Sequence, residues 1–296
     1  MFDDSPNKNK QEQIDLLKQK KTLFILPPTF NIKDYASILS GVWDISPYEI
    51  IWTVDFNKMS ADERLDKYPN KDYNYFKLAS TKYTRTTKSG AKVDYLFNTM
   101  NLNVYKFKKT NKKGYDEYDA TSVATIFFTP NIEQRRENPT AKNINPREFI
   151  NFDLGYLKSY LKVVNSKLKS NGYLNCYNDT YDKVNIKNLQ KQKLFIPSSI
   201  DVKYNAFSRT EGKKRDKDEL LEDYKFPYEL ITDEELNEKL ENDEQIYFLQ
   251  YTQVNGDKLI SVIDSKTNDI IYSSKTGWSY NIKAKDFKAI SNKVED

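Results

Sequence analysis

The chain has 296 residues, of which 38% are hydrophobic and 30% charged, and its 47 basic residues nearly balance 43 acidic ones. This composition allows a packed core and excludes a fully disordered or fibrous chain. Histidine is absent and Cys176 is the single cysteine, so the chain lacks an internal disulfide and the usual general base near neutral pH.

The first patterned region follows a polar tail at 1–21 and predicts a β-α-β crossover. An apolar run ends at Pro27, a helically spaced segment follows Asn31, and a segment rich in strand formers follows Pro47. The strand, helix and strand are expected at 22–26, 32–43 and 48–54. At this spacing the two strands are parallel and their crossover is right-handed.

A helix and an antiparallel meander are expected next, beside the parallel pair. The helix is predicted at 60–68, and the three strands at 75–83, 93–106 and 121–128, the second of them broken near Asn101. A proline-rich loop at 130–146 leads to a long helix at 147–172, in which Gly155 is the weak point. This loop and helix separate the meander from a second patterned region.

The second region repeats the order of the first. Strands are expected at 194–196, 227–231, 246–253, 258–264 and 269–274, and helices at 218–224, 233–241 and 282–291. The pair LFILP and SPYEII, within 23–51, recurs as LFIP and FPYELI within 194–231. We therefore predict an α+β (mixed α/β) fold of two related β-α-β-α-βββ units with mixed sheets. The expected division is a tail at 1–21, a first unit at 22–129, a linker loop and long helix at 130–189, and a second unit at 190–296.

Two resemblances concern export. The stretch from LFILPPTFNIKDYASILSGVW to SPYEII resembles the start of the N-terminal domain of TolB and of CsgG-type lipoproteins, which are β-α-β domains of the bacterial envelope. The segments GYLKSYLKVVNSKLKSNG, LFIPSSIDVK, FPYELITDEELNEKL and DSKTNDIIYSS resemble an uncharacterised family of exported proteins from Bacteroidetes-like bacteria. The resemblance implies a periplasmic or secreted location and no assigned activity, with the cytoplasm as the alternative location.

No sequence motif assigns a reaction. The chain contains no Walker loop, GxGxxG, HExxH, GxSxG or CxxC, so we expect no cofactor and no metal and name no catalytic residue. The repeat-related polar residues and a pair of loop arginines are the candidate binding residues. They are Tyr48, Glu49, Tyr228, Glu229, Arg135 and Arg136.

Three functions remain open at this stage. The first is a non-enzymatic binding or structural protein of the bacterial cell envelope, with a protein or a glycan as its partner. The alternative is a nucleic-acid-binding protein that uses Lys/Tyr-rich strands at 81–92 and 105–115, although the balanced charge argues against it. A second alternative is a hydrolase that depends on carboxylates. No apolar run is long enough for a transmembrane segment.

Overall fold

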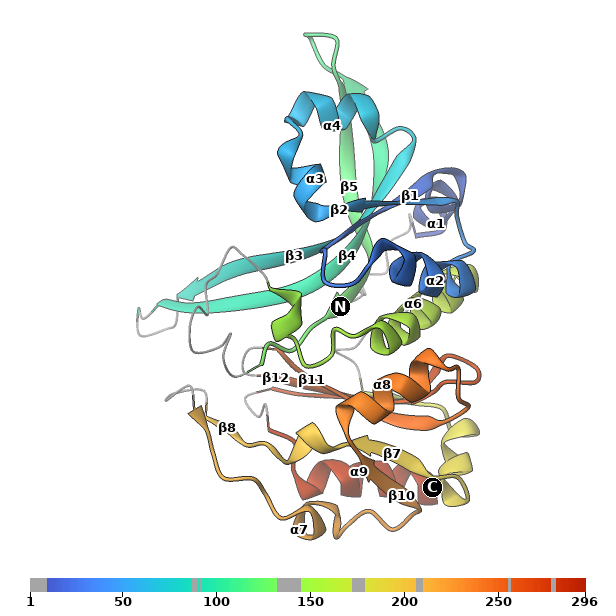
Figure 1. Cartoon of the computed structure of the whole chain (residues 1–296), viewed down its shortest axis with the longest axis vertical. Coiled ribbons are helices and arrows are strands. Elements are labelled where there is room, and N and C mark those ends of the chain that lie inside the picture. The colour runs from blue at the N-terminus through green and yellow to red at the C-terminus, as the bar shows by residue number, and fades with distance from the viewer. Residues whose placement is uncertain are drawn as a thin grey trace. The chain divides into compact units, whose positions relative to one another are not determined.

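The computed structural model of the chain (Figure 1) describes residues 10–86, 90, 92–131, 145–171, 179–205, 210–254, 257–277 and 281–296. It contains helices and two mixed sheets, so the predicted α+β class is confirmed. Contacts divide the chain into two compact units. The first comprises residues 1–79, 98–127 and 160–175, and the second comprises 80–97, 128–159 and 176–296.

The sheet of the first unit has the order β2-β1-β3-β4-β5. Its strands are β1 (Lys21–Leu26), β2 (Tyr48–Trp52), β3 (Tyr73–Thr86), β4 (Lys92–Thr110) and β5 (Asp116–Phe127). β1 runs parallel to both β2 and β3, as the predicted crossover requires, and β4 and β5 are antiparallel. The expected break near Asn101 is wrong, because β4 continues through it with a register shift between Leu102 and Asn103.

Helices flank these strands in the chain. They are α1 (Lys10–Gln19), α2 (Ile32–Val42), α3 (Thr53–Lys58), α4 (Ala61–Lys67) and α6 (Leu154–Lys169), the last of which contributes residues to both units. The predicted strand at 48–54 is too long, because Thr53 begins α3 and Val54 is 47% exposed on it. Helix α4 begins with a capping box, in which the Ser60 side chain accepts a hydrogen bond from the Glu63 backbone N–H.

The predicted helix at 147–172 is too long at its start. A short 3-10 helix, η1 (Pro146–Glu148), comes first, and α6 begins at Leu154. Gly155 therefore lies in the first turn of α6, where its backbone N–H donates to Asn237 Oδ1 at 2.8 Å. A Cβ built on Gly155 would lie 2.1 Å from the carbonyl oxygen of Asn237. The glycine allows this close approach and does not interrupt the helix.

The sheet of the second unit has the order β10-β7-β11-β12-β13-β6. Its strands are β6 (Thr180–Tyr181), β7 (Leu194–Pro197), β10 (Tyr228–Ile231), β11 (Tyr247–Val254), β12 (Asp257–Asp264) and β13 (Asp269–Thr276). β7 is parallel to β10 and β11, and the remaining pairs are antiparallel. A separate short pair joins β8 (Tyr204–Asn205) to β9 (Thr210–Glu211).

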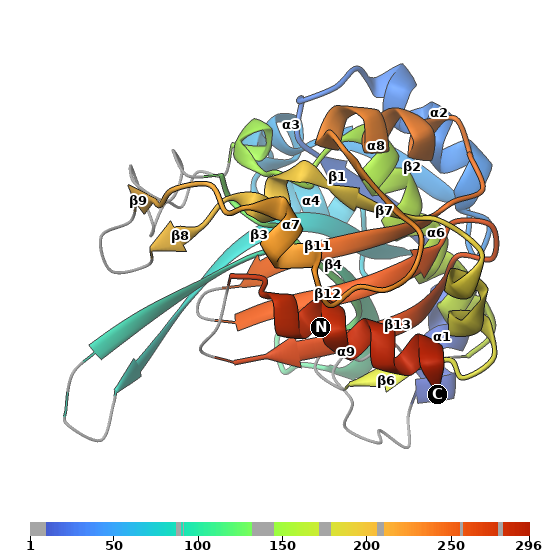
Figure 2. The same cartoon turned by 90° about the horizontal axis from the view of Figure 1, so that it is seen from below.

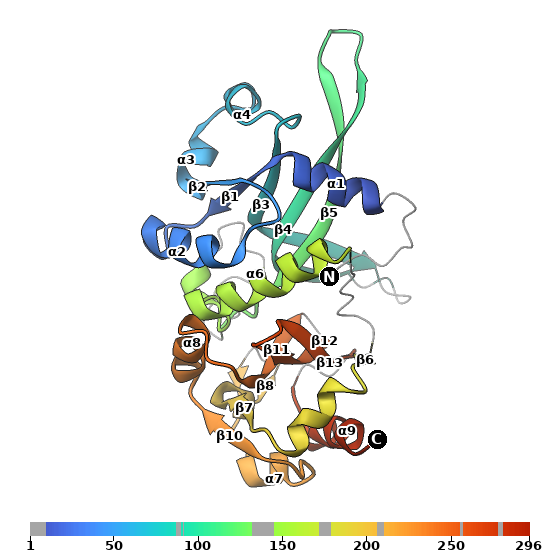
Figure 3. The ribbon, with the colours of Figure 1, turned by 90° about the vertical axis from the view of Figure 1, so that its right-hand side faces the viewer.

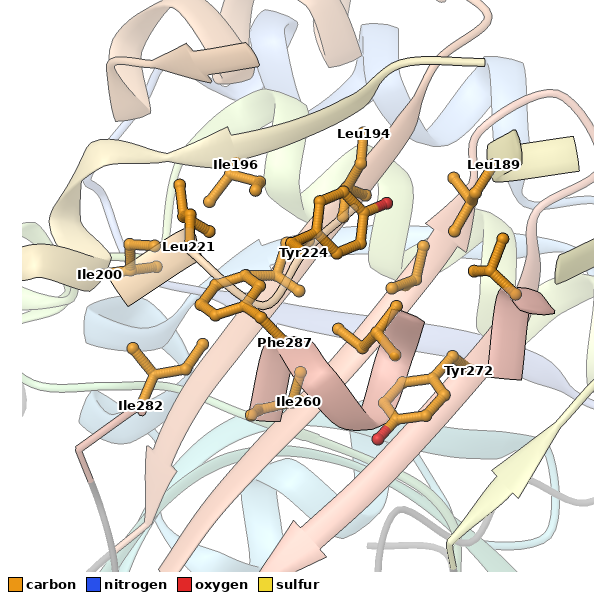
Figure 4. Packing of buried hydrophobic residues seen from close by; sticks show 14 of the residues in the cluster. Leu189, Leu194, Ile196, Ile200, Leu221, Tyr224, Ile260, Tyr272, Ile282 and Phe287 are labelled. Carbon is orange, nitrogen blue, oxygen red and sulfur yellow. The ribbon is translucent and has the colours of Figure 1, made fainter. Parts of the chain in front are cut away.

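Helices and one apolar cluster complete the second unit. The helical segments are η2 (Asn185–Gln190), η3 (Ser198–Asp201), α7 (Lys217–Leu221), α8 (Asp233–Glu241) and α9 (Ala284–Glu295). Helix α9 lies along the sheet formed by β11, β12 and β13 (Figure 2). Its Phe287 is fully buried in an apolar cluster to which β7, β12 and η2 also contribute side chains (Figure 4). Burial of this apolar face is the main stabilising contribution to the unit.

The two units share one connectivity. The order β2-β1-β3-β4-β5 is matched by β10-β7-β11-β12-β13. Thr22 N donates to Pro47 O at 2.8 Å, and Leu194 N donates to Pro227 O at 3.0 Å, so Thr22 and Leu194 occupy equivalent positions. The sequence match instead aligned Leu23 with Leu194, which is one residue out of register. Because side chains alternate along a strand, that slip assigns them to opposite faces.

Candidate functional site

Strands β2 and β10 carry four of the candidate binding residues, and each forms an edge of its sheet. We call them the PYE strands, after the Pro-Tyr-Glu sequence at the start of each. Tyr48 and Glu49 lie on β2, which ends the first sheet. Glu49 accepts hydrogen bonds from Lys21 Nζ at 2.7 Å and from Tyr73 Oη at 3.0 Å. The hydrogen bond from Lys21 is the main cause that lowers the pKa of Glu49. The carboxylate is therefore held ionised by its partners, and nothing in this arrangement prepares it to exchange a proton.

The equivalent residues of the second unit repeat this ion pair. Glu229 accepts from Lys193 Nζ at 2.6 Å, and Tyr228, 38% exposed, has its ring 6.0 Å from that of Tyr224. Lys21 is the first residue of β1, and Lys193 directly precedes β7. The two Tyr-Glu pairs belong to different units, so the structure describes them as separate sites. The other two candidates, Arg135 and Arg136, lie outside the described residues.

Both PYE strands turn backbone groups away from their sheets. Pro47 O accepts from Thr22, and hydrogen bonding alternates along a parallel strand, so Glu49 also faces β1. The N–H and C=O groups of Tyr48 and Ile50 consequently point outward. Among the described residues, no strand pairs with this outer side of β2.

The side chains of β2 leave this edge accessible. All five, Tyr48 to Trp52, are partly exposed. On one face Tyr48 packs against Phe24, with ring centroids 5.9 Å apart, and Trp52 lies 6.0 Å from Tyr35. On the other face Ile51 packs on a buried cluster. We call these five residues the β2 edge: an open backbone ladder bordered by ordered apolar and aromatic side chains.

The corresponding edge of the second unit is less open. β10 has four residues, and Ile231 at its end is buried. Pro227 O accepts from Leu194, so the backbone groups of Tyr228 and Leu230 point outward, as those of Tyr48 and Ile50 do. Short strands are one way in which proteins protect an edge from unwanted pairing. Of the two edges, β2 is therefore the stronger candidate for binding.

Three of the five lysines of the Lys/Tyr-rich segment at 105–115 have acidic partners. Lys106 pairs with Glu12 at 2.8 Å. Across the β4–β5 hairpin, two further lysines pair with acidic residues of β5: the ion pairs are Lys108–Asp119 and Lys109–Glu117. These contacts neutralise charge that a phosphate backbone requires. In the segment at 81–92, residues 87–89 and 91 lie outside the described residues.

Carboxylates gather near the start of α8, where two of them have raised pKa values. Burial is the main cause that raises the pKa of Asp153 and of Asp233, and repulsion from Glu241 adds to it at Asp153. Asp233 accepts from Ser199 Oγ at 2.9 Å and from Tyr156 Oη at 3.3 Å. Within the described part of the chain, no three acidic or cysteine side chains are placed to hold a metal ion. These hydrogen bonds hold the Asp233 side chain in place, so its position has a structural explanation.

The second unit contains buried charged side chains that the sequence analysis did not predict. Lys258 is fully buried and forms an ion pair with Asp286, while burial lowers the pKa of the lysine. Arg215 donates to the carbonyl oxygens of Ile200 and Ile282. Lys258 is two residues after an Asn-Gly pair that predicts a turn, where a lysine is expected in solvent. These charges connect η3, β12 and the start of α9.

In comparisons with known proteins, no family model, no curated protein and no solved structure matches the chain. Among the described residues, no helix is both long and apolar enough to span a membrane.

Proposed function

We propose that the chain is a non-enzymatic binding protein of the bacterial cell envelope that captures an extended segment of a partner protein as an additional strand on β2. The observation that carries the proposal is the β2 edge, where Tyr48 and Ile50 direct unpaired backbone groups outward. The envelope location rests on the sequence resemblance to exported proteins.

Strand addition uses two kinds of contact that the β2 edge supplies. Main-chain hydrogen bonds to Tyr48 and Ile50 give affinity, and contacts with alternate side chains give specificity. Tyr48, Ile50 and Trp52 share one face of the strand, so they would contact alternate side chains of the added segment. A partner segment with β-branched or aromatic residues at alternate positions fits this surface best.

A proline substitution tests the edge directly. Because the N–H of Ile50 faces away from β1, Ile50→Pro removes a donor of the open ladder and retains pairing with β1. Leu230→Pro on β10 is the matched control at the equivalent outward position. Peptides selected against the wild-type chain from a random displayed library should bind Ile50→Pro at least about tenfold more weakly, since one or more hydrogen bonds are lost. Leu230→Pro should bind them normally.

Hydrogen exchange and cell fractionation complete the test. Bound peptide should slow amide exchange of Tyr48 and Ile50, whose N–H groups face outward. Selected peptides that bind Ile50→Pro as tightly as the wild type would contradict strand addition.

The complete gene product is expected in the envelope or medium fraction of its cells, and a purely cytoplasmic pool would contradict the envelope assignment alone.

A further inference from the structure

The β4–β5 hairpin of the first unit extends past its sheet as a two-stranded arm (Figure 3). Residues 106–110 and 112–116 are exposed, so both faces of the arm are in solvent there. Tyr105 packs on a buried cluster, whereas Phe107 is 52% exposed. Alternate burial of aromatic side chains along β4 therefore ends at Tyr105.

Contacts at its base hold the arm in place. Lys20 Nζ donates to the carbonyl oxygen of Tyr105 at 2.5 Å and lies 5.8 Å from the ring centre of Tyr118. The ion pair between Lys106 and Glu12 joins the arm to α1. The arm is thus anchored to α1 and to Lys20, the residue between α1 and β1.

The tip of the arm is a structured turn. The backbone N–H of Asn111 donates to Tyr115 O at 2.8 Å, while Asn111 Oδ1 accepts from the N–H groups of Lys113 at 2.9 Å and Tyr115 at 3.1 Å. Gly114 has φ 83°, a left-handed conformation that favours glycine. This turn holds the backbone of Tyr115, which is 69% exposed. Because the backbone of the turn is already ordered, less backbone entropy is lost when it binds.

Two of the arm's five lysines lie at this tip. Lys108 and Lys109 on the arm are neutralised by Asp119 and Glu117. Lys112 and Lys113 are exposed, and no ion pair involves them within the described part of the chain. The tip therefore combines two free lysines with an exposed tyrosine.

We propose that this tip, Lys112 to Tyr115, docks onto an anionic lipid surface. Lysines attracted to anionic headgroups, beside an aromatic ring at headgroup depth, are the usual chemistry of a membrane-surface contact. These residues lie at the end of a two-stranded arm, which suits contact with a flat surface, and the neighbouring carboxylate of Asp116 accepts a hydrogen bond from Thr110 Oγ1 at 2.8 Å. A single-stranded nucleic acid instead requires a basic groove that follows its backbone. The site is separate from the β2 edge, and the two proposals can fail independently.

Vesicle binding by the full chain tests the lipid contact. The probes are vesicles of phosphatidylcholine with phosphatidylglycerol and vesicles of phosphatidylcholine alone. The chain should sediment with the first and not with the second. The double variant Lys112→Ser/Lys113→Ser should bind roughly 25-fold more weakly, about fivefold for each lysine. Lys213→Ser/Lys214→Ser removes the same charge from an exposed segment of the second unit and should leave binding unchanged.

A second measurement locates the tyrosine. Tyr115→Trp adds a tryptophan at the tip to the three that the wild type contains elsewhere. Lipids brominated near the headgroup should quench more tryptophan fluorescence in this variant than in the wild type. The proposal is overturned if the wild type ignores anionic vesicles, or if both double variants lose binding equally. It is also overturned, in favour of a nucleic-acid contact, if the tip lysines are needed for binding of single-stranded DNA and vesicles are not bound.

Discussion

Gly155 and Gly41 are both helical glycines, and their surroundings predict opposite effects of alanine. At Gly155 a Cβ would meet the backbone of Asn237 at 2.1 Å, a contact that requires α6 and α8 to move apart. At Gly41, in α2, a Cβ would meet nothing within 4 Å. Gly155→Ala should therefore lower the free energy of unfolding by about 1–3 kcal/mol through overpacking. Gly41→Ala should raise it by about 0.5–1 kcal/mol through helix propensity.

Urea denaturation followed by circular dichroism measures both changes, and each variant is the control for the other. The opposite signs matter more than the magnitudes, because helix propensity alone predicts stabilisation at both positions. A stabilising Gly155→Ala would show that the close approach of α6 to Asn237 is not present in solution.

Single residues also mark the limit of sequence analysis at the candidate site. The repeated Tyr-Glu pairs were found by sequence, and both glutamates proved to be ion-paired, with Lys21 and Lys193. A lysine at the start of each strand region was the available signal, but the sequence match began at Leu23 and Leu194 and excluded it. No local signal predicted the burial of Lys258, because its partner Asp286 is distant in the chain.

At the scale of elements, the ends of strands depend on pairing with distant parts of the chain, which local sequence patterns do not show. Residues 48–54 read as one strand, since Thr53 and Val54 are β-branched. Only Tyr48–Trp52 pairs with β1, and the chain beyond that ladder forms α3. Capped helices were predicted closely, as α8 shows: Thr232 accepts from the Glu235 N–H at 3.1 Å, and its own N–H donates to Glu235. Caps are local, and strand ends depend on distant partners.

The helix that follows each meander holds the loop before the PYE strand. In the first unit Asn165 of α6 accepts from the N–H groups of Asp44 at 3.4 Å and Ile45 at 3.2 Å, and it donates to the Asp44 carboxylate. In the second unit Ser291 of α9 accepts from the Lys225 N–H at 3.2 Å. These contacts connect the start of each edge strand to a helix.

Alanine substitutions should reveal this difference between the two helices. Asn165→Ala removes three hydrogen bonds and should cost about 2 kcal/mol, whereas Ser291→Ala removes the bond to Lys225 and should cost about 1 kcal/mol. Ser166→Ala, at the next position of α6, is the control and should be nearly neutral. Denaturant titration gives the three values. A larger loss for Ser291→Ala than for Asn165→Ala would contradict this account of the loops.

At the scale of the whole chain, the sequence predicted the repeated order of elements, which the matching sheet orders show. The start of the second unit depends on contacts that a local sequence pattern does not show. The pattern predicts a start at residue 190, but Ile186 and Leu189 of η2 are fully buried in the core of that unit. Strand β6 also pairs with β13 ahead of this boundary. Apolar residues in a short 3-10 helix carry no recognisable period, so sequence alone did not assign η2 to the unit.

Two fragments test where the second unit begins. A fragment of residues 179–296 retains β6 and η2, and it should unfold cooperatively in urea. A fragment of 190–296 lacks Ile186 and Leu189, each of which should contribute about 2–5 kcal/mol by burial. Their joint loss approaches the whole stability of a typical domain, so the shorter fragment should lack a cooperative transition. Equal stability of both fragments would show that η2 contributes little. If neither folds while the full chain does, residues 128–159, which belong to the same compact unit, are required as well.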